Sequence, residues 1–409
     1  MTVKSKFTHL TKEEPDPIIK TLTQYHQDQS PNKLDVSIGV YKSPDGLLYT
    51  FPSIIEAKEI YHNEKNYGHN YTTMSGIKEF INGSQQLLFG KDVITSDGEK
   101  KIASIQTIAG TGAIHMGLLF FMEAGYKNFY LGLPSWLNYI PMIETVGGKV
   151  NTYEYYNTAN GEINFDTVKK TLIEAPKNSV FIFQTCCHNP TGADFNNDQW
   201  IEVVKLIKQY DHLVLMDTAY LGFSSGDLIK DSWILRYMYE EAEIEFVVAQ
   251  SFLKNMGLYG ERLGAVHVIV QDENYVDHAQ STLVANFRHE CSFAPSFGAR
   301  LAQIIFENDK LYQQWTKEVN QVTQRLQNLR QLVYQTLIKL ETPGNWKTVI
   351  QQKGLFWYSG LTPQQNDRLI SNHNVYSTSI GRVNIAGLNE QNVEYFCKAI
   401  DEVVRHNYE

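Results

Sequence analysis

Short apolar runs alternate with helical patterns between about residues 51 and 270. The runs are Ile102–Ile108, Phe129–Leu133, Val180–Phe183, Leu213–Met216, Phe246–Ala249 and Leu263–Val270. Several are apolar on both faces, as expected for strands of a sheet that helices cover on each side. Helical patterns such as Asp198–Tyr210 and Asp231–Glu241 lie between most of them. This alternation predicts a mainly parallel α/β sheet, whose ligands bind beyond the carboxyl ends of its strands.

The pattern changes near Ser296. A helical pattern without proline extends from there to Leu340, and a smaller α+β unit follows. Its expected elements are Gly354–Tyr358, Thr362–Asn372, Val375–Ser377, Arg382–Ala386 and a last helix from Asn389. An apolar run near the N-terminus, Val36–Tyr41, could join this unit. We therefore predict an N-terminal arm with part of the small domain (1–48), a large domain (49–310) and a small C-terminal domain (311–409).

Composition and charge narrow the functional classes. The 409 residues include 36 Lys and Arg and 45 Asp and Glu, which leaves a formal net charge of −9. Without a dense basic run, a surface for nucleic acid or anionic membrane is not expected. The longest apolar run, near Met116–Met122, is far shorter than a membrane span. The N-terminus lacks an apolar stretch and carries acidic residues, so no targeting peptide is indicated and a cytoplasmic enzyme is expected.

The four cysteines indicate neither a disulfide framework nor a metal site. Cys186 and Cys187 are adjacent, and neighbours on a strand point to opposite faces. A zinc site at Cys186, Cys187 and His188 lacks a second pair of ligands at the required spacing. Buried, reduced thiols fit the pattern better, as in a reducing compartment.

Three clusters of small and polar residues follow predicted strands. Ala109-Gly110-Thr111-Gly112 opens a helix, where free backbone amides and the helix dipole favour a phosphate. Alone it also fits a purely steric turn. Cys187–Gly192 closes the run Val180–Phe183 and also fits a turn. Asp217–Tyr220 ends the run Leu213–Met216, where a turn or helix cap and a functional role fit about equally.

The fourth cluster, Gln250–Arg262, contains a lysine among uncharged and apolar neighbours. Lys254 stands eight residues before Arg262, which is not typical of a solvated loop. Desolvation would lower the pKa of the lysine and make its neutral, nucleophilic amine accessible.

Four motifs together resemble one enzyme family. HNPTG (188–192), DTAYLGF (217–223), SFLKNMGLYGER (251–262) and GRVNIAGL (381–388) look like those of class I pyridoxal-phosphate aminotransferases, the aspartate and aromatic amino-acid group. The match extends from Pro15-Asp16-Pro17 to the last helix. The resemblance implies a seven-stranded sheet, a smaller α+β domain, bound pyridoxal 5′-phosphate and a homodimer.

The resemblance also implies the role of each residue in the motifs. Lys254 would bind the cofactor as a Schiff base and act as the catalytic base. Asp217 would pair with the ring nitrogen, while Tyr220 and Asn189 bond the phenolic oxygen and Trp136 stacks on the ring. Gly110, Thr111, Ser251 and Arg262 of the same chain would hold the phosphate. Tyr71 of the neighbouring subunit would also reach it.

Two arginines are expected to bind the substrate. Arg382 would hold the α-carboxylate, with Asn189, Trp136 and the Gly39 backbone beside it. Arg288 would come from the neighbouring subunit and bind a distal carboxylate. Each residue has a structural alternative, such as a surface ion pair or core packing, which loses ground because all positions are filled together.

Three positions depart from the family pattern. Ala109 replaces a serine, which removes one hydrogen bond to the phosphate, and Tyr139 replaces a histidine that backs the ring-binding Asp217. Phe293 replaces an asparagine beside Arg288, which favours aromatic substrates. Lys42, Asn70 and Thr111 look more like the aspartate form.

The predicted reaction is a ping-pong transfer of an amino group between amino acids and 2-oxo acids. Dicarboxylic or aromatic L-amino acids would donate, and 2-oxoglutarate would accept. A lyase or decarboxylase on the same fold is the alternative within enzymes, and the presence of Arg288 argues for transfer. The alternative that is not an enzyme is a non-catalytic regulator that keeps the fold. The presence of Lys254 and Arg382 argues against this alternative.

Overall fold

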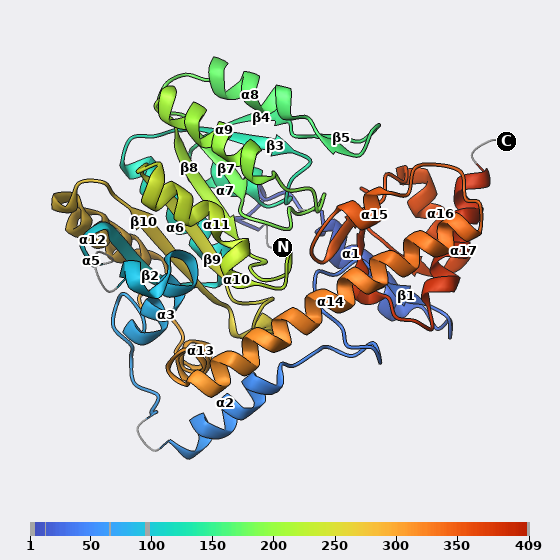
Figure 1. The fold of residues 1–409 in the computed structure, drawn as a ribbon, viewed down its shortest axis with the longest axis horizontal. Helices are drawn as coiled ribbons and strands as arrows, with labels where there is room; N and C mark the ends of the chain where they lie inside the picture. The colour runs from blue at the N-terminus through green and yellow to red at the C-terminus, as the bar shows by residue number, and fades with distance from the viewer. Residues whose placement is uncertain (1–4, 13, 65–66, 95–98, 407–409) are drawn as a thin grey trace.

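The central feature of the molecule is a seven-stranded sheet covered by helices (Figure 1). A computed structural model describes residues 5–12, 14–64, 67–94 and 99–406. The strands are β2 (Ile102–Ile108), β3 (Asn128–Leu133), β4 (Lys149–Glu154), β7 (Val180–Gln184), β8 (Leu213–Thr218), β9 (Phe246–Ser251) and β10 (Leu263–Ile269). Their order is β2-β10-β9-β8-β7-β3-β4, and only β10 runs antiparallel to its neighbours. The mainly parallel, seven-stranded α/β sheet is confirmed.

Helices bury both faces of this sheet. Alternate residues of β8 belong to different cores, since Val214 and Met216 pack on one side and Leu215 on the other. Helices α6 (Ala109–Glu123) and α12 (Val276–Glu290) cover the Leu215 side. The opposite side is covered by α3 (Lys78–Phe89), α8 (Phe165–Glu174), α9 (Asn197–Gln209), α10 (Leu228–Asp231) and α11 (Trp233–Arg236). Burial of both faces explains the continuous apolar runs of the central strands.

A smaller unit surrounds the second half of a long helix, α14 (Asp309–Lys339). It contains α1 (Pro17–Gln27), α15 (Thr348–Gln351), α16 (Pro363–His373) and α17 (Val393–Arg405). Two short sheets belong to it, β1 (Leu34–Asp35) with β12 (Val375–Tyr376), and β11 (Phe356–Tyr358) with β13 (Arg382–Asn384). Since α14 contacts α2 and α13 as well as α15 and α17, it connects the two units, and the domain boundaries at 48 and 310 stay predictions.

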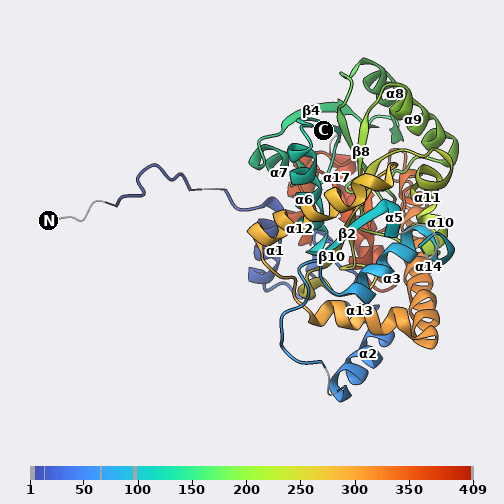
Figure 2. The same ribbon diagram turned by 90° about the vertical axis from the view of Figure 1, so that its left-hand side faces the viewer.

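The remaining elements are short or peripheral. They are α2 (Pro52–Asn63), α4 (Lys91–Val93), α5 (Glu99–Lys101), α7 (Tyr139–Thr145), β5 (Tyr156–Asn157), β6 (Glu162–Ile163), the π-helix η2 (Tyr237–Glu241), α13 (Phe297–Glu307) and the 3₁₀ turns η3 (Tyr259–Glu261), η4 (Glu273–Tyr275) and η5 (Ile385–Gly387). Residues 5–12 extend away from the body of the protein (Figure 2). Within the described ranges, no helix is long and apolar enough to cross a bilayer.

Two predicted helices differ from the structure. The helix expected from Ser296 to Leu340 is interrupted at Asn308, whose side chain accepts a hydrogen bond from the Leu311 amide and starts a new helix. The helix expected over Asp231–Glu241 is divided among α10, α11 and η2. The run Val36–Tyr41 joins the small unit, as its apolar character suggested, since the Val36 amide donates to the Tyr376 carbonyl and the Asn384 side chain donates to the Ile38 and Val40 carbonyls.

Candidate active site

One cavity lies at the carboxyl ends of β7, β8 and β9. These strands run parallel, so their last residues meet at one edge of the sheet. The space of this open cavity, including the part that opens to solvent, is about 430 Å³. Its lining residues are Gly110, Thr111, Ile114, Trp136, Gln184, Asn189, Asp217, Ala219, Tyr220, Ser251, Leu253 and Lys254. Eight of the residues singled out in the sequence therefore meet at one cavity, although they come from five separate stretches of the chain.

Lys254 reaches the cavity from the loop that follows β9. Its Nζ atom lies 5.0 Å from the centroid of the Tyr220 ring. Desolvation lowers the pKa of Lys254 to about 8, because the opposing effect of Asp217 is smaller and the charges of Arg262 and Arg382 act in the same direction as burial. A large share of this amine is therefore neutral in mildly alkaline solution, as a nucleophile or base requires.

Asp217 lies near the end of β8 with one oxygen committed and one free. The Tyr139 hydroxyl donates a hydrogen bond to Oδ2, while Oδ1 is buried and has no partner among the described residues. Desolvation raises the pKa of Asp217 to about 6, against the lowering effects of Tyr139 and Lys254. Burial, followed by the charge of Asp217, raises the pKa of Tyr139 well above its usual value, so this hydroxyl stays a donor. The free oxygen is therefore an acceptor available to a donor from a bound group.

Arg382 is buried and bonded to a cavity residue. Its Nη1 donates to Asn189 Oδ1 at 3.1 Å and its Nη2 to the Ser37 carbonyl at 2.8 Å. The guanidinium also lies 4.2 Å from the centroid of the Phe356 ring. The Nε atom of Arg382 is buried without a partner among the described residues. This arrangement brings a fixed positive charge to the side of the cavity where Asn189 lies.

Gln184 is a cavity residue that we did not single out in the sequence. Its amide nitrogen donates to the Asn189 carbonyl at 3.1 Å, and its oxygen accepts from the Asn189 amide at 2.8 Å. These two hydrogen bonds fix the backbone of Asn189. Because Gln184 is a polar residue at the end of an apolar strand, its location at the carboxyl end of β7 was the signal that could have identified it.

The first turn of α6 approaches Ser251 closely. A Cβ atom on Gly110 would lie 2.8 Å from the Ser251 Cβ, so only glycine fits here. Ala109 has a φ of 62°, and its amide donates to the Arg262 carbonyl at 2.7 Å. The Arg262 side chain is exposed, donates to the Tyr259 carbonyl at 3.2 Å, and does not line the cavity. The free amides of this turn and the dipole of α6 make an anion site beside Ser251.

Tyr71 and Arg288 lie together, outside the cavity of their own chain. Tyr71 is 80% exposed and stacks on Phe293, with ring centroids 4.7 Å apart. Arg288 donates to the Ser292 hydroxyl at 2.6 Å, and its guanidinium lies 5.8 Å from the Phe293 centroid. Gly39 also lies outside the lining, against the Phe356 ring next to Arg382.

Comparisons with known proteins agree with this geometry. The model of the family described as aminotransferase class I and II matches residues 31–400. The cytoplasmic aspartate aminotransferase of Saccharomyces cerevisiae is 36% identical over 408 residues, which cover 98% of this chain and 97% of the relative. A solved structure titled as aspartate aminotransferase from the cytoplasm of that yeast has a TM-score of 0.94 at 35% identity, covering 98% of this chain and 99% of the other.

A third similar protein is an aromatic-amino-acid aminotransferase from Burkholderia pseudomallei, solved covalently bound to pyridoxal phosphate. Its TM-score is 0.93 at 28% identity, with 98% of this chain and 100% of the other covered. The family match spans most of the chain, and the yeast relative is similar over nearly all of it. The chain therefore belongs to the class I and II aminotransferase family.

Proposed function

We propose that this aminotransferase uses pyridoxal 5′-phosphate to move amino groups from aspartate, glutamate or aromatic L-amino acids to 2-oxoglutarate by a ping-pong mechanism. The observation that carries the proposal is the meeting of Lys254, Asp217 and Asn189 at one cavity, with Arg382 bonded to Asn189. The yeast relative is named an aspartate aminotransferase, and the Burkholderia structure an aromatic one, which supports this range of substrates.

The residues present fit this cofactor. The unpartnered Oδ1 of Asp217 suits a protonated ring nitrogen, and the Trp136 side chain provides a flat face for a ring. The close approach of Gly110 to Ser251 leaves the backbone amides of α6 open to a phosphate. Arg262 would complete the phosphate site by turning its exposed side chain, and Asn189 and Tyr220 would bond the phenolic oxygen. When bound, the cofactor supplies an electron sink that weakens the Cα–H bond of the substrate.

The chain's own residues bind the substrate and move its proton. Arg382 holds the α-carboxylate through charge-assisted hydrogen bonds and thereby fixes the direction of the Cα–H bond. Lys254, whose lowered pKa leaves it partly neutral, would act as the general base that removes the proton from the substrate Cα atom. Tyr220, whose ring lies under the Lys254 amine, keeps that amine close to the reacting atoms.

A panel of amino donors tests the proposal. The holoenzyme should convert aspartate, glutamate, tyrosine or phenylalanine to the 2-oxo acid when 2-oxoglutarate is supplied. In the absence of an acceptor, each active site should release one equivalent of 2-oxo acid and no ammonia. Sustained release of ammonia or carbon dioxide would indicate a lyase or a decarboxylase instead. The panel also ranks dicarboxylic against aromatic donors.

We further propose that the active enzyme is a homodimer. Tyr71 and Arg288 are exposed on a single chain and lie away from their own cavity, which suits residues that serve the cavity of a neighbour. Tyr71 would reach the neighbour's phosphate and Arg288 the distal carboxylate of its substrate. The yeast relative is named cytoplasmic, and we propose the same location for this enzyme.

Replacing Arg288 with alanine should raise KM for aspartate, glutamate and 2-oxoglutarate about 10- to 100-fold, since a hydrogen-bonded charge pair contributes roughly 1.5–3 kcal/mol. KM for phenylalanine and tyrosine as donors should change much less, because these side chains offer no carboxylate to Arg288. Steady-state kinetics with each donor measure the difference. An Arg368→Ala variant, which removes an exposed arginine of α16, serves as the control. Equal effects on both substrate classes would show that Arg288 does not bind the distal carboxylate.

Mixing two defective variants tests the shared site. A hybrid of Lys254→Ala and Arg288→Ala chains contains one site with both defects and one with neither. Activity on aspartate should therefore return when the two proteins are unfolded and refolded together. If mixing restores nothing while the hybrid dimer forms, Arg288 does not serve a neighbouring site.

The rate at which the apoenzyme binds pyridoxal 5′-phosphate covalently should rise with pH through about 8. The reason is that Lys254 loses its proton near this pH, whereas a solvated lysine does so near 10.4. Borohydride reduction of samples taken over time, followed by mass spectrometry, measures the rate. Lys254→Ala should give no adduct at any pH. The rate should level off above about pH 9, and a rate that still rises tenfold per pH unit there would contradict the lowered pKa.

A further inference from the structure

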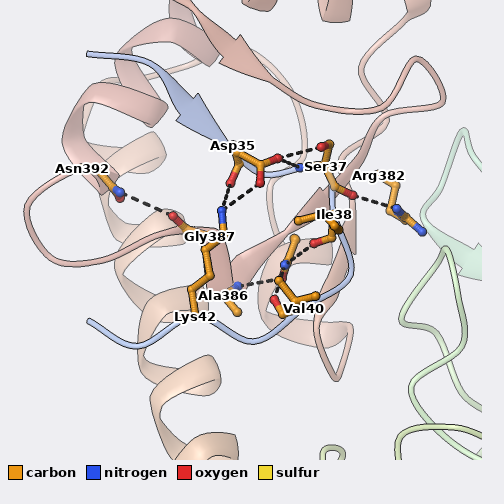
Figure 3. Close-up of polar contacts among 10 residues, drawn as sticks. Asp35, Ser37, Ile38, Val40, Lys42, Arg382, Ala386, Gly387 and Asn392 are labelled. Atoms are coloured by element: carbon orange, nitrogen blue, oxygen red, sulfur yellow. Dashed lines mark hydrogen bonds and ion pairs between the residues drawn. The ribbon is translucent and has the colours of Figure 1, made fainter. Parts of the chain in front are cut away.

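The side chain of Asn384 on β13 bonds the middle of the segment from Asp35 to Lys42, whose residues Ser37, Ile38 and Val40 are labelled in Figure 3. The Asn384 side-chain nitrogen donates to the Ile38 carbonyl at 2.6 Å and to the Val40 carbonyl at 2.7 Å. The Asn384 oxygen accepts from the Ala386 amide at 2.9 Å. Asn384 is 1% exposed, so both donors of its amide are used in a buried setting. The two carbonyls lie on either side of Gly39.

Gly39 is thereby placed against the support of Arg382. A Cβ atom on Gly39 would lie 2.9 Å from the Phe356 Cζ atom, so the backbone at Gly39 contacts this ring. The same ring lies 4.2 Å from the Arg382 guanidinium. Phe356 on β11 pairs with Asn384 on β13, two residues from Arg382. The segment, the ring and the guanidinium form one packed group.

The segment also touches Arg382 directly. The Ser37 carbonyl accepts the bond from Arg382 Nη2 at 2.8 Å, and the Asn384 amide donates to the Val36 carbonyl at 2.7 Å. Movement of the segment would therefore change which hydrogens of the guanidinium are free. A carboxylate needs two of them in fixed directions for a bidentate pair.

An ion pair closes the two ends of the segment. Lys42 Nζ lies 2.8 Å from Asp35 Oδ2, and the Ser37 amide and hydroxyl donate to Asp35 Oδ1 at 2.9 and 2.6 Å. Burial alone would raise the pKa of Asp35, but the charge and hydrogen bond of Lys42 together with the Ser37 bonds hold it below its usual value. The ends are thus tied to each other, while Asn384 ties the middle to β13.

We propose that Asn384 is a positioning residue for substrate binding, which holds the segment around Gly39 so that Arg382 presents its guanidinium to the α-carboxylate. The proposal rests on the proposed function of Arg382. Asn384 does not line the cofactor cavity, so its effect passes through the segment and Arg382 alone. Its loss should therefore weaken the binding of substrate and leave the binding of cofactor intact.

The test is an Asn384→Asp variant, which keeps the shape and the acceptor for Ala386 but cannot donate to Ile38 and Val40. KM for amino donors and 2-oxo acids should rise about 10- to 100-fold, as expected for a displaced binding group. We expect kcat to stay within about threefold, because Lys254 and Asp217 are untouched. Cofactor retention after gel filtration should equal that of the wild type.

Asn392→Asp is the matched control. Its side-chain nitrogen, at the left of Figure 3, donates one hydrogen bond of 3.5 Å to the Gly387 carbonyl, and its oxygen accepts from the Asn389 amide at 2.8 Å. This variant should keep KM within about twofold of the wild type. An unchanged KM in folded Asn384→Asp would overturn the proposal. A joint loss of kcat, KM and cofactor would also overturn it, by showing a general structural role.

Limited proteolysis supplies a measurement that does not depend on activity. The Lys42 side chain is 18% exposed, and cleavage by trypsin after Lys42 requires the segment to leave β13. The fragment that ends at Lys42 should form faster in Asn384→Asp than in the wild type or in Asn392→Asp. Equal rates of cleavage in Asn384→Asp and the wild type would show that Asn384 does not anchor the segment. If the wild type showed no transamination, the proposed function would fail, whereas a faster cut would still establish the anchor.

Discussion

Replacing Lys254 with alanine is expected to lower the rate of transamination by roughly 10⁴-fold or more, because the variant loses both its nucleophile and its catalytic base. No other lysine lines the cavity among the described residues, so no neighbour can take over. The cofactor should still bind without a covalent bond, since Asp217, Trp136 and Ser251 remain. Single-turnover kinetics with aspartate or phenylalanine measure the loss.

The control is Lys230→Ala, which removes an exposed lysine of α10. It should have the activity of the wild type. Near-normal turnover in Lys254→Ala would show that this lysine is not the catalytic base, and it would contradict the proposed reaction. Mass spectrometry after borohydride reduction should show one cofactor per chain in the control and none in Lys254→Ala.

Replacing Asp217 with asparagine is expected to lower kcat about 10²- to 10³-fold, the usual cost of removing one oriented electrostatic partner. The charge that favours a protonated ring nitrogen is lost, and the free Oδ1 acceptor is exchanged for an amide that can present a donor. Cofactor retention should fall as well. Burial makes this effect large, because no water replaces the missing charge.

Asp211→Asn tests whether the effect belongs to the site. Asp211 precedes the same strand, is exposed and pairs with Lys177 on the surface, so the variant should behave as the wild type. If Asp217→Asn keeps its kcat and its cofactor, the free oxygen does not face the ring nitrogen. Tyr139, which donates to Oδ2, would then have only a packing role.

The strands of the central sheet are predictable because they are buried on both faces. β7, β8 and β9 contain uninterrupted apolar residues, which favour strands covered on both faces of a sheet. β4 was missed for the opposite reason. Its sequence, Lys149–Glu154, has only two apolar residues, Val150 and Tyr153, and lies at the edge of the sheet, so it lacks the apolar run by which the others are recognised.

The breaks in the helices depend on single residues whose effect is tertiary. Asparagine is favoured at the start of a helix, and in the structure Asn308 caps α14 and separates it from α13. The periodicity of apolar residues continues across this position, because both helices bury one face against the same core. The apolar periodicity of the sequence therefore predicts that both helices are buried on one face, but it does not predict that the chain changes direction between them.

Local sequence determined that Lys254 follows a buried strand among apolar neighbours, and this was enough to predict a lysine of lowered pKa, because desolvation follows from composition. It also determined Asp217 at the end of β8 and the glycine at the start of α6. Only the tertiary structure decided that Tyr139 bonds one oxygen of Asp217 and leaves the other free, that Gln184 fixes Asn189, and that Asn384 holds the segment beside Arg382. These contacts join residues whose distance in space depends on the packing of whole elements, which no local pattern of polar and apolar residues encodes.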